Sequence, residues 1–192
     1  MSTTLVMALR AASLVAFAAP LLLAVGGRRR VPNTRAGQAR INRVPVIANF
    51  TAFALFLPSL LTFAGTLEGY AALLLALTGC LLAVAGAGLV LRSRMELGLA
   101  WSLVPMADDA TGVVTTGPYR HVRHPIYFGL SMLAMGQALA FANWPAVLVV
   151  LAGVVPTFVW RASAEEKLLA ATFGERYARY RKQTKMIIPR LF

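Results

Sequence analysis

Five apolar runs, each close to the length that a helix needs to cross a membrane, limit what this 192-residue chain can fold into. A hydrocarbon core of roughly 30 Å takes about 20 helical residues to cross, and spans of about 17 to 25 residues are typical. The fourth run is the shortest. The sequence therefore predicts an all-α integral membrane bundle of about five transmembrane helices, at residues 4–25, 46–63, 70–91, 126–141 and 144–160.

Composition agrees with a membrane protein, since 58% of the residues are hydrophobic and only 14% are charged. A soluble domain of this size could not bury that much apolar surface. The length leaves room for one compact unit, a single domain over residues 1–192, and for no separate catalytic domain of the usual size. Any active site must therefore be built from the bundle and its loops.

Basic residues mark alternate connections between the runs. The first connection, the third connection and the stretch after the fifth run hold 18 of the 19 Lys and Arg residues, whereas the second and fourth connections hold none. Because short cytoplasmic loops are enriched in Lys and Arg, this pattern predicts an N-terminus outside and a C-terminus in the cytoplasm. The remaining basic residue, Arg10, lies within the first run, and we expect it to snorkel to the outer interface or to face the bundle interior.

The net charge of +12 could indicate a nucleic-acid partner. Its distribution follows the predicted topology, however, so we expect membrane lipids with anionic headgroups to be the partners, and no nucleic acid. In residues 1–27 the apolar run precedes the positive cluster, which is the reverse of a signal peptide and predicts an N-out anchor. Cys80 is the sole cysteine, so it cannot form an intramolecular disulfide, and we expect it to pack inside the third helix.

The third connection, residues 92–125, is far longer than the few residues that usually join helices, and loops of that length tend to be functional. Gly117-Pro118 predicts a turn within it. Pro125 suits the first turn of the next helix and keeps His124 out of the α region. The residues alone leave two interpretations of His124 open, which are capping of the membrane interface and binding of a ligand.

The last two runs and the residues after them form a second group of predictions. Ala142-Asn143 predicts a tight turn that makes runs four and five a helical hairpin. Residues 161–182 predict a cytoplasmic amphipathic helix, in which Arg161 and Glu165 share a face. This helix either lies on the membrane with an ordinary surface ion pair or contributes to a site. Its apolar and aromatic stripe consists of Leu168, Leu169, Phe173, Tyr177 and Tyr180.

Two motifs in these segments carry a resemblance to a known family. The first is G-x-Y-x-x-x-R-H-P-x-Y-x-G, formed by Gly117, Tyr119, Arg123, His124, Pro125, Tyr127 and Gly129. The second is R-x-x-x-E-E followed by F-G-x-x-Y-x-x-Y, formed by Arg161, Glu165, Glu166, Phe173, Gly174, Tyr177 and Tyr180. In these two motifs, over about the last 80 residues, the chain resembles the isoprenylcysteine carboxyl methyltransferases and the related phospholipid methyltransferases.

The resemblance implies an S-adenosylmethionine-dependent methyltransferase that requires no metal. Arg161 would then be the catalytic residue that faces a lipophilic methyl acceptor, as expected for an anionic acceptor such as the carboxylate of an isoprenylated cysteine. Methyl transfer needs chiefly that donor and acceptor are aligned and water is excluded. The cofactor-binding residues implied by the resemblance are Thr111, Gly112, Val113, Val114, Tyr119, His124, Pro125, Ile126, Tyr127, Glu165 and Glu166.

Three alternatives remain at this point. The family usually has a longer acidic run after the arginine, where this chain has Ala162, Ser163 and Ala164, so a phospholipid amine, an isoprenoid, or a small hydrophobic thiol or acid is also possible as the acceptor. Membrane sterol reductases resemble this fold and use NADPH, but they typically show N-Y-x-G followed by an acidic residue, where this chain has IYFGL at 126–130. A non-enzymatic membrane scaffold is the third.

Overall fold

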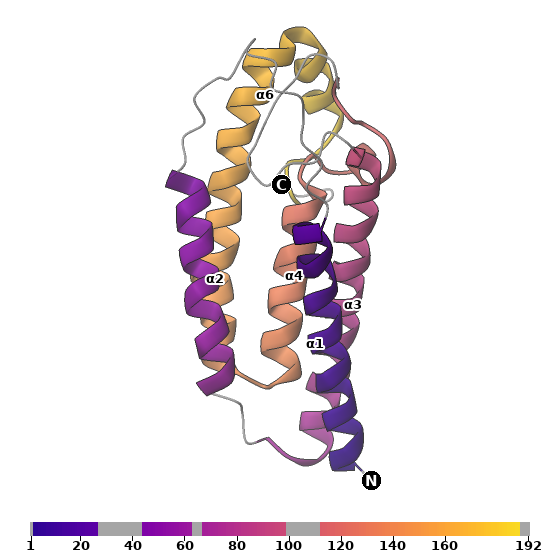
Figure 1. Ribbon diagram of the computed structural model, residues 1–192, viewed down its shortest axis with the longest axis vertical. Coiled ribbons are helices and arrows are strands. Elements are labelled where there is room, and N and C mark those ends of the chain that lie inside the picture. The colour runs from indigo at the N-terminus through magenta and orange to yellow at the C-terminus, as the bar shows by residue number, and fades with distance from the viewer. Residues whose placement is uncertain (1, 27–43, 63–66, 99–111, 189–192) are drawn as a thin grey trace.

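The computed structural model describes residues 2–26, 44–62, 67–98 and 112–188, and these form an all-α bundle of long helices that run alternately up and down (Figure 1). The helix that ends at Leu97 and the helix that begins at Pro125 meet at one end of the bundle, which we call the motif end, and their other ends lie at the opposite end. The elements are α1 (Ser2–Gly26), α2 (Val44–Thr62), α3 (Gly69–Leu97), the 3-10 helix η2 (Gly117–Arg120), α4 (Pro125–Ala140), α5 (Trp144–Val149), the π-helix η3 (Val150–Val154) and α6 (Val155–Gln183).

The five predicted apolar runs all correspond to helices. Among the described residues, three helical stretches are long and apolar enough to cross a membrane, namely α1, α3 and the continuous stretch from α5 to α6. The apolar parts of α2 and α4 are shorter. The structure therefore confirms an all-α protein with several candidate spans, and crossing of the membrane by α2 and α4 remains a prediction.

Small residues bring α3 and α4 into close contact along their length, with α1 packed against both helices. A Cβ added at Gly79 would lie 2.3 Å from the main-chain nitrogen of Ala140, and one at Gly136 would lie 2.6 Å from that of Ala83. Helices in membranes commonly associate through such small residues, because these allow the backbones to touch. Cys80 is buried in α3, as predicted.

The turn between α4 and α5 confirms the predicted hairpin. Ala142 has a φ of 49°, and the Asn143 side chain caps α5 by accepting a hydrogen bond of 2.9 Å from the Ala146 amide. Its Nδ2 donates to the Ser59 carbonyl of α2 at 2.8 Å. Arg10, half-buried, donates from Nε to the Ala140 carbonyl at 3.0 Å, where a cation suits the C-terminal end of a helix.

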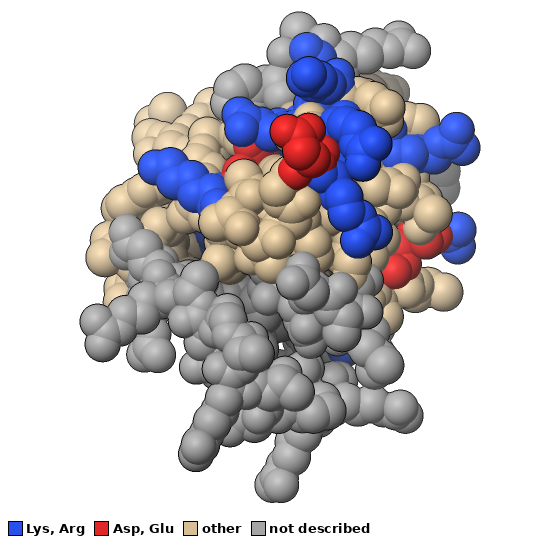
Figure 2. Space-filling model, turned by 90° about the horizontal axis from the view of Figure 1, so that it is seen from above, with Lys and Arg blue, Asp and Glu red and all other residues tan. Residues whose placement is uncertain are grey.

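Residues 161–182, predicted as an amphipathic helix, are the continuation of the fifth run. They lie within α6, which extends past the apolar part of the bundle at the motif end and bends at Gly174, where φ is 49°. Phe173, Tyr177 and Tyr180 are buried, so the aromatic stripe packs inward as a cluster with Val113 and Leu169. The charged face points outward, and Figure 2 shows basic side chains gathered on this end of the molecule.

Candidate active site

The first motif begins with a tight turn tied to the end of α3. Gly117 has a φ of 56°, and a Cβ there would lie 2.6 Å from side-chain atoms of Glu96, so the position requires glycine. Thr116 Oγ1 donates to Glu96 Oε2 at 2.8 Å, and Pro118 lies in the first turn of η2. The turn predicted at Gly117-Pro118 is therefore confirmed, and it sets the direction in which the chain approaches α4.

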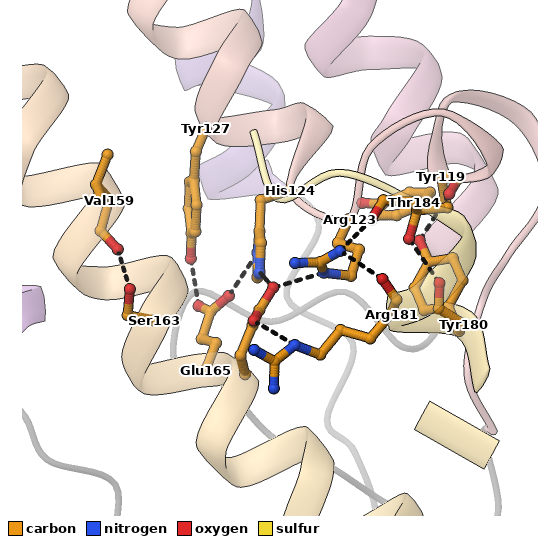
Figure 3. A network of polar contacts seen from close by, with 11 residues as sticks. Tyr119, Arg123, His124, Tyr127, Val159, Ser163, Glu165, Tyr180, Arg181 and Thr184 are labelled. Carbon is orange, nitrogen blue, oxygen red and sulfur yellow. Dashed lines mark hydrogen bonds and ion pairs between the residues drawn. The ribbon is translucent and has the colours of Figure 1, made fainter. Parts of the chain in front are cut away.

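His124 occupies the N-cap of α4 with φ −123° and ψ 59°, outside the α region as expected before Pro125. Its ring is buried and stacks on the ring of Tyr127, with centroids 5.5 Å apart and planes 5° apart. Nδ1 lies 3.4 Å from Glu165 Oε2, and Nε2 lies 3.6 Å from Glu166 Oε1. The two motifs, some 40 residues apart in sequence, therefore meet at this histidine (Figure 3).

Tyr127 is the second point of contact between the motifs. Its hydroxyl donates a hydrogen bond to Glu165 Oε1, and its other ring face stacks on Phe158 with a centroid distance of 5.1 Å. Cζ of Arg161 lies 5.3 Å from the Tyr127 ring centroid, and its Nε lies 3.6 Å from Glu165 Oε1. Arg161 and Glu165 therefore share a face of α6 as predicted, but that face is directed at α4.

Glu166 points to a different set of partners. Its Oε1 accepts a hydrogen bond from Arg123 Nε at 2.6 Å, and its Oε2 lies 3.4 Å from Arg181 Nε. Both carboxylate oxygens are thus held by arginines of this chain, and the side chain is buried. Both glutamates lie near His124, but only Glu165 also contacts Tyr127 and Arg161.

The segment after α6, residues 184–188, which we call the strap, lies against the first motif. The Arg123 amide donates to the Lys185 carbonyl at 2.8 Å, and the His124 amide donates to the Met186 carbonyl at 2.9 Å. Sequence reasoning missed both the strap and Arg123 as site residues. These bonds use main-chain carbonyls, which leave no signal in side-chain patterns, whereas Arg123 could have been found from its place in the motif.

The other predicted cofactor residues lie in two places. Pro125 is buried in the first turn of α4, and Ile126, partly buried beside it, packs against the bundle core. Tyr119 is buried under α6, and its carbonyl accepts a hydrogen bond of 2.6 Å from the Tyr180 hydroxyl. Gly112, Val113 and Val114 are half-buried, and Val113 packs against the aromatic cluster of α6. Thr111 lies outside the described residues.

The charges around His124 decide its protonation. Burial lowers the pKa of His124, but the carboxylates of Glu165 and Glu166 outweigh burial and hold it above the ordinary value of 6.5. The protonated, cationic form of the His124 imidazole is therefore favoured between these two carboxylates. Burial also raises the pKa of the Tyr119 hydroxyl, which stays protonated.

Comparison with known proteins places the chain in a family. The family model described as PEMT, phospholipid methyltransferase, matches residues 74–176. The protein-S-isoprenylcysteine O-methyltransferase of Schizosaccharomyces pombe is 35% identical over 77 residues, which are 40% of this chain and 33% of that protein.

A solved structure of a eukaryotic intramembrane Ras methyltransferase, isoprenylcysteine carboxyl methyltransferase, is similar in fold. Its TM-score is 0.53 at 22% sequence identity, covering 79% of this chain and 55% of that one. The chain thus spans about a third of the curated relative and about half of the solved one. Because the phospholipid methyltransferase model matches more than half of the sequence, the chain belongs to that family of membrane enzymes.

Proposed function

We propose that this protein transfers a methyl group from S-adenosylmethionine to a lipophilic acceptor at the cytoplasmic face of a membrane. The observation that carries the proposal is the meeting of His124, Tyr127, Arg161 and Glu165 at the motif end. The group joins a carboxylate, two stacked rings and a buried guanidinium, just beyond the apolar segment of the fifth run. Membership in the phospholipid methyltransferase family supports the same reaction.

The residues present fit the cofactor. S-adenosylmethionine, when bound, supplies a methyl group activated by a sulfonium cation, together with an amine and a ribose. Glu165 offers a carboxylate for its amine, and Tyr127 places an aromatic side chain directly beside that carboxylate. Nε2 of His124 is buried and faces Glu166 Oε1 at 3.6 Å, so the imidazole lies between the two carboxylates and holds Glu165 in place. We assign the cofactor first to Glu165, His124 and Tyr127. The other residues implied by the resemblance, Thr111–Val114, Tyr119, Pro125, Ile126 and Glu166, stay predicted cofactor residues.

Arg161 determines the class of acceptor. Its guanidinium is buried, lies over Tyr127 and is directed at the same region as Glu165, so it favours an anionic group. A carboxylate such as that of an isoprenylated cysteine fits, and the name of the S. pombe relative specifies O-methylation of an isoprenylcysteine. The family description favours a phospholipid amine as the second candidate.

The protein contributes to methyl transfer chiefly by holding the two reactants in position. Arg161 and Glu165 lie on α6 and Tyr127 lies in the first turn of α4, so two helices in contact hold the three side chains. Aligned donors and acceptors can gain roughly 7 to 11 kcal/mol over free reactants. Phe158 closes the site towards the bundle core, which keeps water from that side.

Isothermal titration of the purified protein in detergent tests the proposal. We expect S-adenosylhomocysteine to bind and NADPH not to bind. Binding of NADPH alone would favour the reductase alternative, and binding of neither would favour the scaffold. A panel of prenylated thiols, isoprenoid and fatty acids, and phospholipid amines with labelled methyl donor would then identify the acceptor, and methylation of the amines alone would contradict the role of Arg161.

A further inference from the structure

The strap attaches the C-terminal segment to the peptide that carries His124. The Arg123 and His124 amides donate in succession to the Lys185 and Met186 carbonyls, and Val122 pairs with Lys185 as an isolated parallel bridge. A histidine just before a helix would otherwise be held from one side only, by Pro125 and the first turn of α4. The strap fixes it from the other side through the backbone.

Arg123 extends this attachment through its side chain. Its Nη1 donates to the carbonyls of Thr184 and Arg181, the latter at 3.2 Å, while its Nε donates to Glu166 at 2.6 Å. The arginine and glutamate side chains are only 9% and 8% exposed, so the pair is shielded from solvent. One guanidinium thus joins the last turn of α6, the strap and the residue next to Glu165 (Figure 3).

The strap also packs against the bundle through an apolar side chain. Ile187 is 5% exposed and belongs to the same hydrophobic cluster as Tyr127 and Phe158. Loss of the strap would therefore uncover the main-chain side of His124 and remove a buried side chain from this hydrophobic cluster.

We propose that Arg123 and the strap form a latch that positions His124 and Glu165, so that the segment after α6 is part of the framework of the active site. Arg123 is then a positioning residue, since it acts through Glu166 and the peptide of His124. The effect of the latch on cofactor binding rests on the proposed function, whereas its effect on His124 does not.

The two histidines of the chain allow a direct test of the latch. His121 is exposed and His124 is buried three residues later, so acylation by diethylpyrocarbonate, carried out above the raised pKa of His124 and read by peptide mass, has an internal reference. We expect His124 to be protected in the wild type and in the control Arg120→Gln, an exposed arginine of the same segment. In folded Arg123→Gln, and in a chain ended after Gln183, we expect it to react at close to the rate of His121. Equal reaction in the wild type, or full protection in Arg123→Gln, would overturn the latch.

Cofactor affinity separates positioning from general support of the fold. We expect Arg123→Gln to weaken S-adenosylhomocysteine binding roughly 10- to 100-fold, as small misplacements at active sites do, while the KM for the acceptor changes little. Arg123→Lys, which keeps the charge, should recover part of the affinity. An Arg123→Gln protein that melts earlier but binds S-adenosylhomocysteine like the wild type would contradict the proposal. If the wild type itself does not bind this ligand, the proposed function fails, and the acylation result still decides the latch.

Discussion

The guanidinium of Arg161 lies over the ring of Tyr127, with Cζ 5.3 Å from the ring centroid. The hydroxyl of the same tyrosine donates a hydrogen bond to Glu165, one turn further along α6. A single aromatic side chain of α4 therefore contacts both members of the Arg161–Glu165 ion pair of α6. If Glu165 holds the cofactor and Arg161 holds the acceptor, as proposed above, Tyr127 contacts both binding residues.

Glu165→Ala and Arg161→Ala should fail in different ways. Glu165→Ala should weaken S-adenosylhomocysteine binding, because losing a hydrogen bond to a charged group costs about 1.5 to 3 kcal/mol. Arg161→Ala should leave that affinity nearly unchanged and remove turnover of an anionic acceptor. Titration calorimetry and a labelled-methyl assay measure the two effects.

Lys167→Ala is the matched control for this pair, because Lys167 is an exposed charge of the same helix. It should change neither affinity nor turnover, since an exposed charge contributes about 0 to 1 kcal/mol. Equal and small losses in Glu165→Ala and Arg161→Ala, with binding intact, would reduce the two residues to a structural ion pair.

The raised pKa of His124 should make stability depend on pH. Because the folded protein binds this proton more tightly than the unfolded chain, the stabilisation is complete below the ordinary pKa of 6.5. It is lost as pH rises through the folded value. Thermal melts in detergent from about pH 5 to about pH 9 should show this loss in the wild type and in His121→Gln, and a flatter profile in His124→Gln. A His124→Gln profile parallel to that of the wild type would refute the assignment.

Gly86 should tolerate no side chain, because a Cβ there would lie 2.6 Å from the Gly129 carbonyl oxygen of α4. Gly86→Ala should therefore lower the stability of the bundle by about 1 to 3 kcal/mol, the usual cost of overpacking. Gly88, two residues along the same helix, has open space at its Cβ position, so Gly88→Ala is the control and should cause no loss. Thermal melts in detergent compare the two, and equal stability would contradict the close packing of α3 on α4.

The predicted orientation can be tested by cysteine labelling in a Cys80→Ala background. Glu68 and Trp144 are exposed at the opposite end of the bundle, and Lys182 is exposed at the motif end. A membrane-impermeant maleimide should label Glu68→Cys and Trp144→Cys from outside the cell, and Lys182→Cys only after the membrane is opened. Labelling of Lys182→Cys on intact cells would reverse the topology.

The sequence by itself determined the helices and pointed to several of the residues that meet at the candidate site, but not to the strap. Apolar runs predict spanning helices because the bilayer imposes both their length and their polarity. Local rules also determined the turn at Gly117, the non-helical backbone of His124 and the tight turn at Ala142-Asn143, since each depends on only a few neighbouring residues.

Only the tertiary structure decided which of these elements meet. The predictions placed Glu165 and Glu166 together at the cofactor. In the structure both lie near His124, but Glu165 also contacts Tyr127, whereas Glu166 is paired with Arg123 and Arg181. Successive helical residues differ by about 100° around the axis, so each partner depends on how α6 packs against α4 and the strap. The strap is held by main-chain carbonyls that every residue type offers, and its pairing with Arg123 and His124 therefore emerges only once the whole chain has folded.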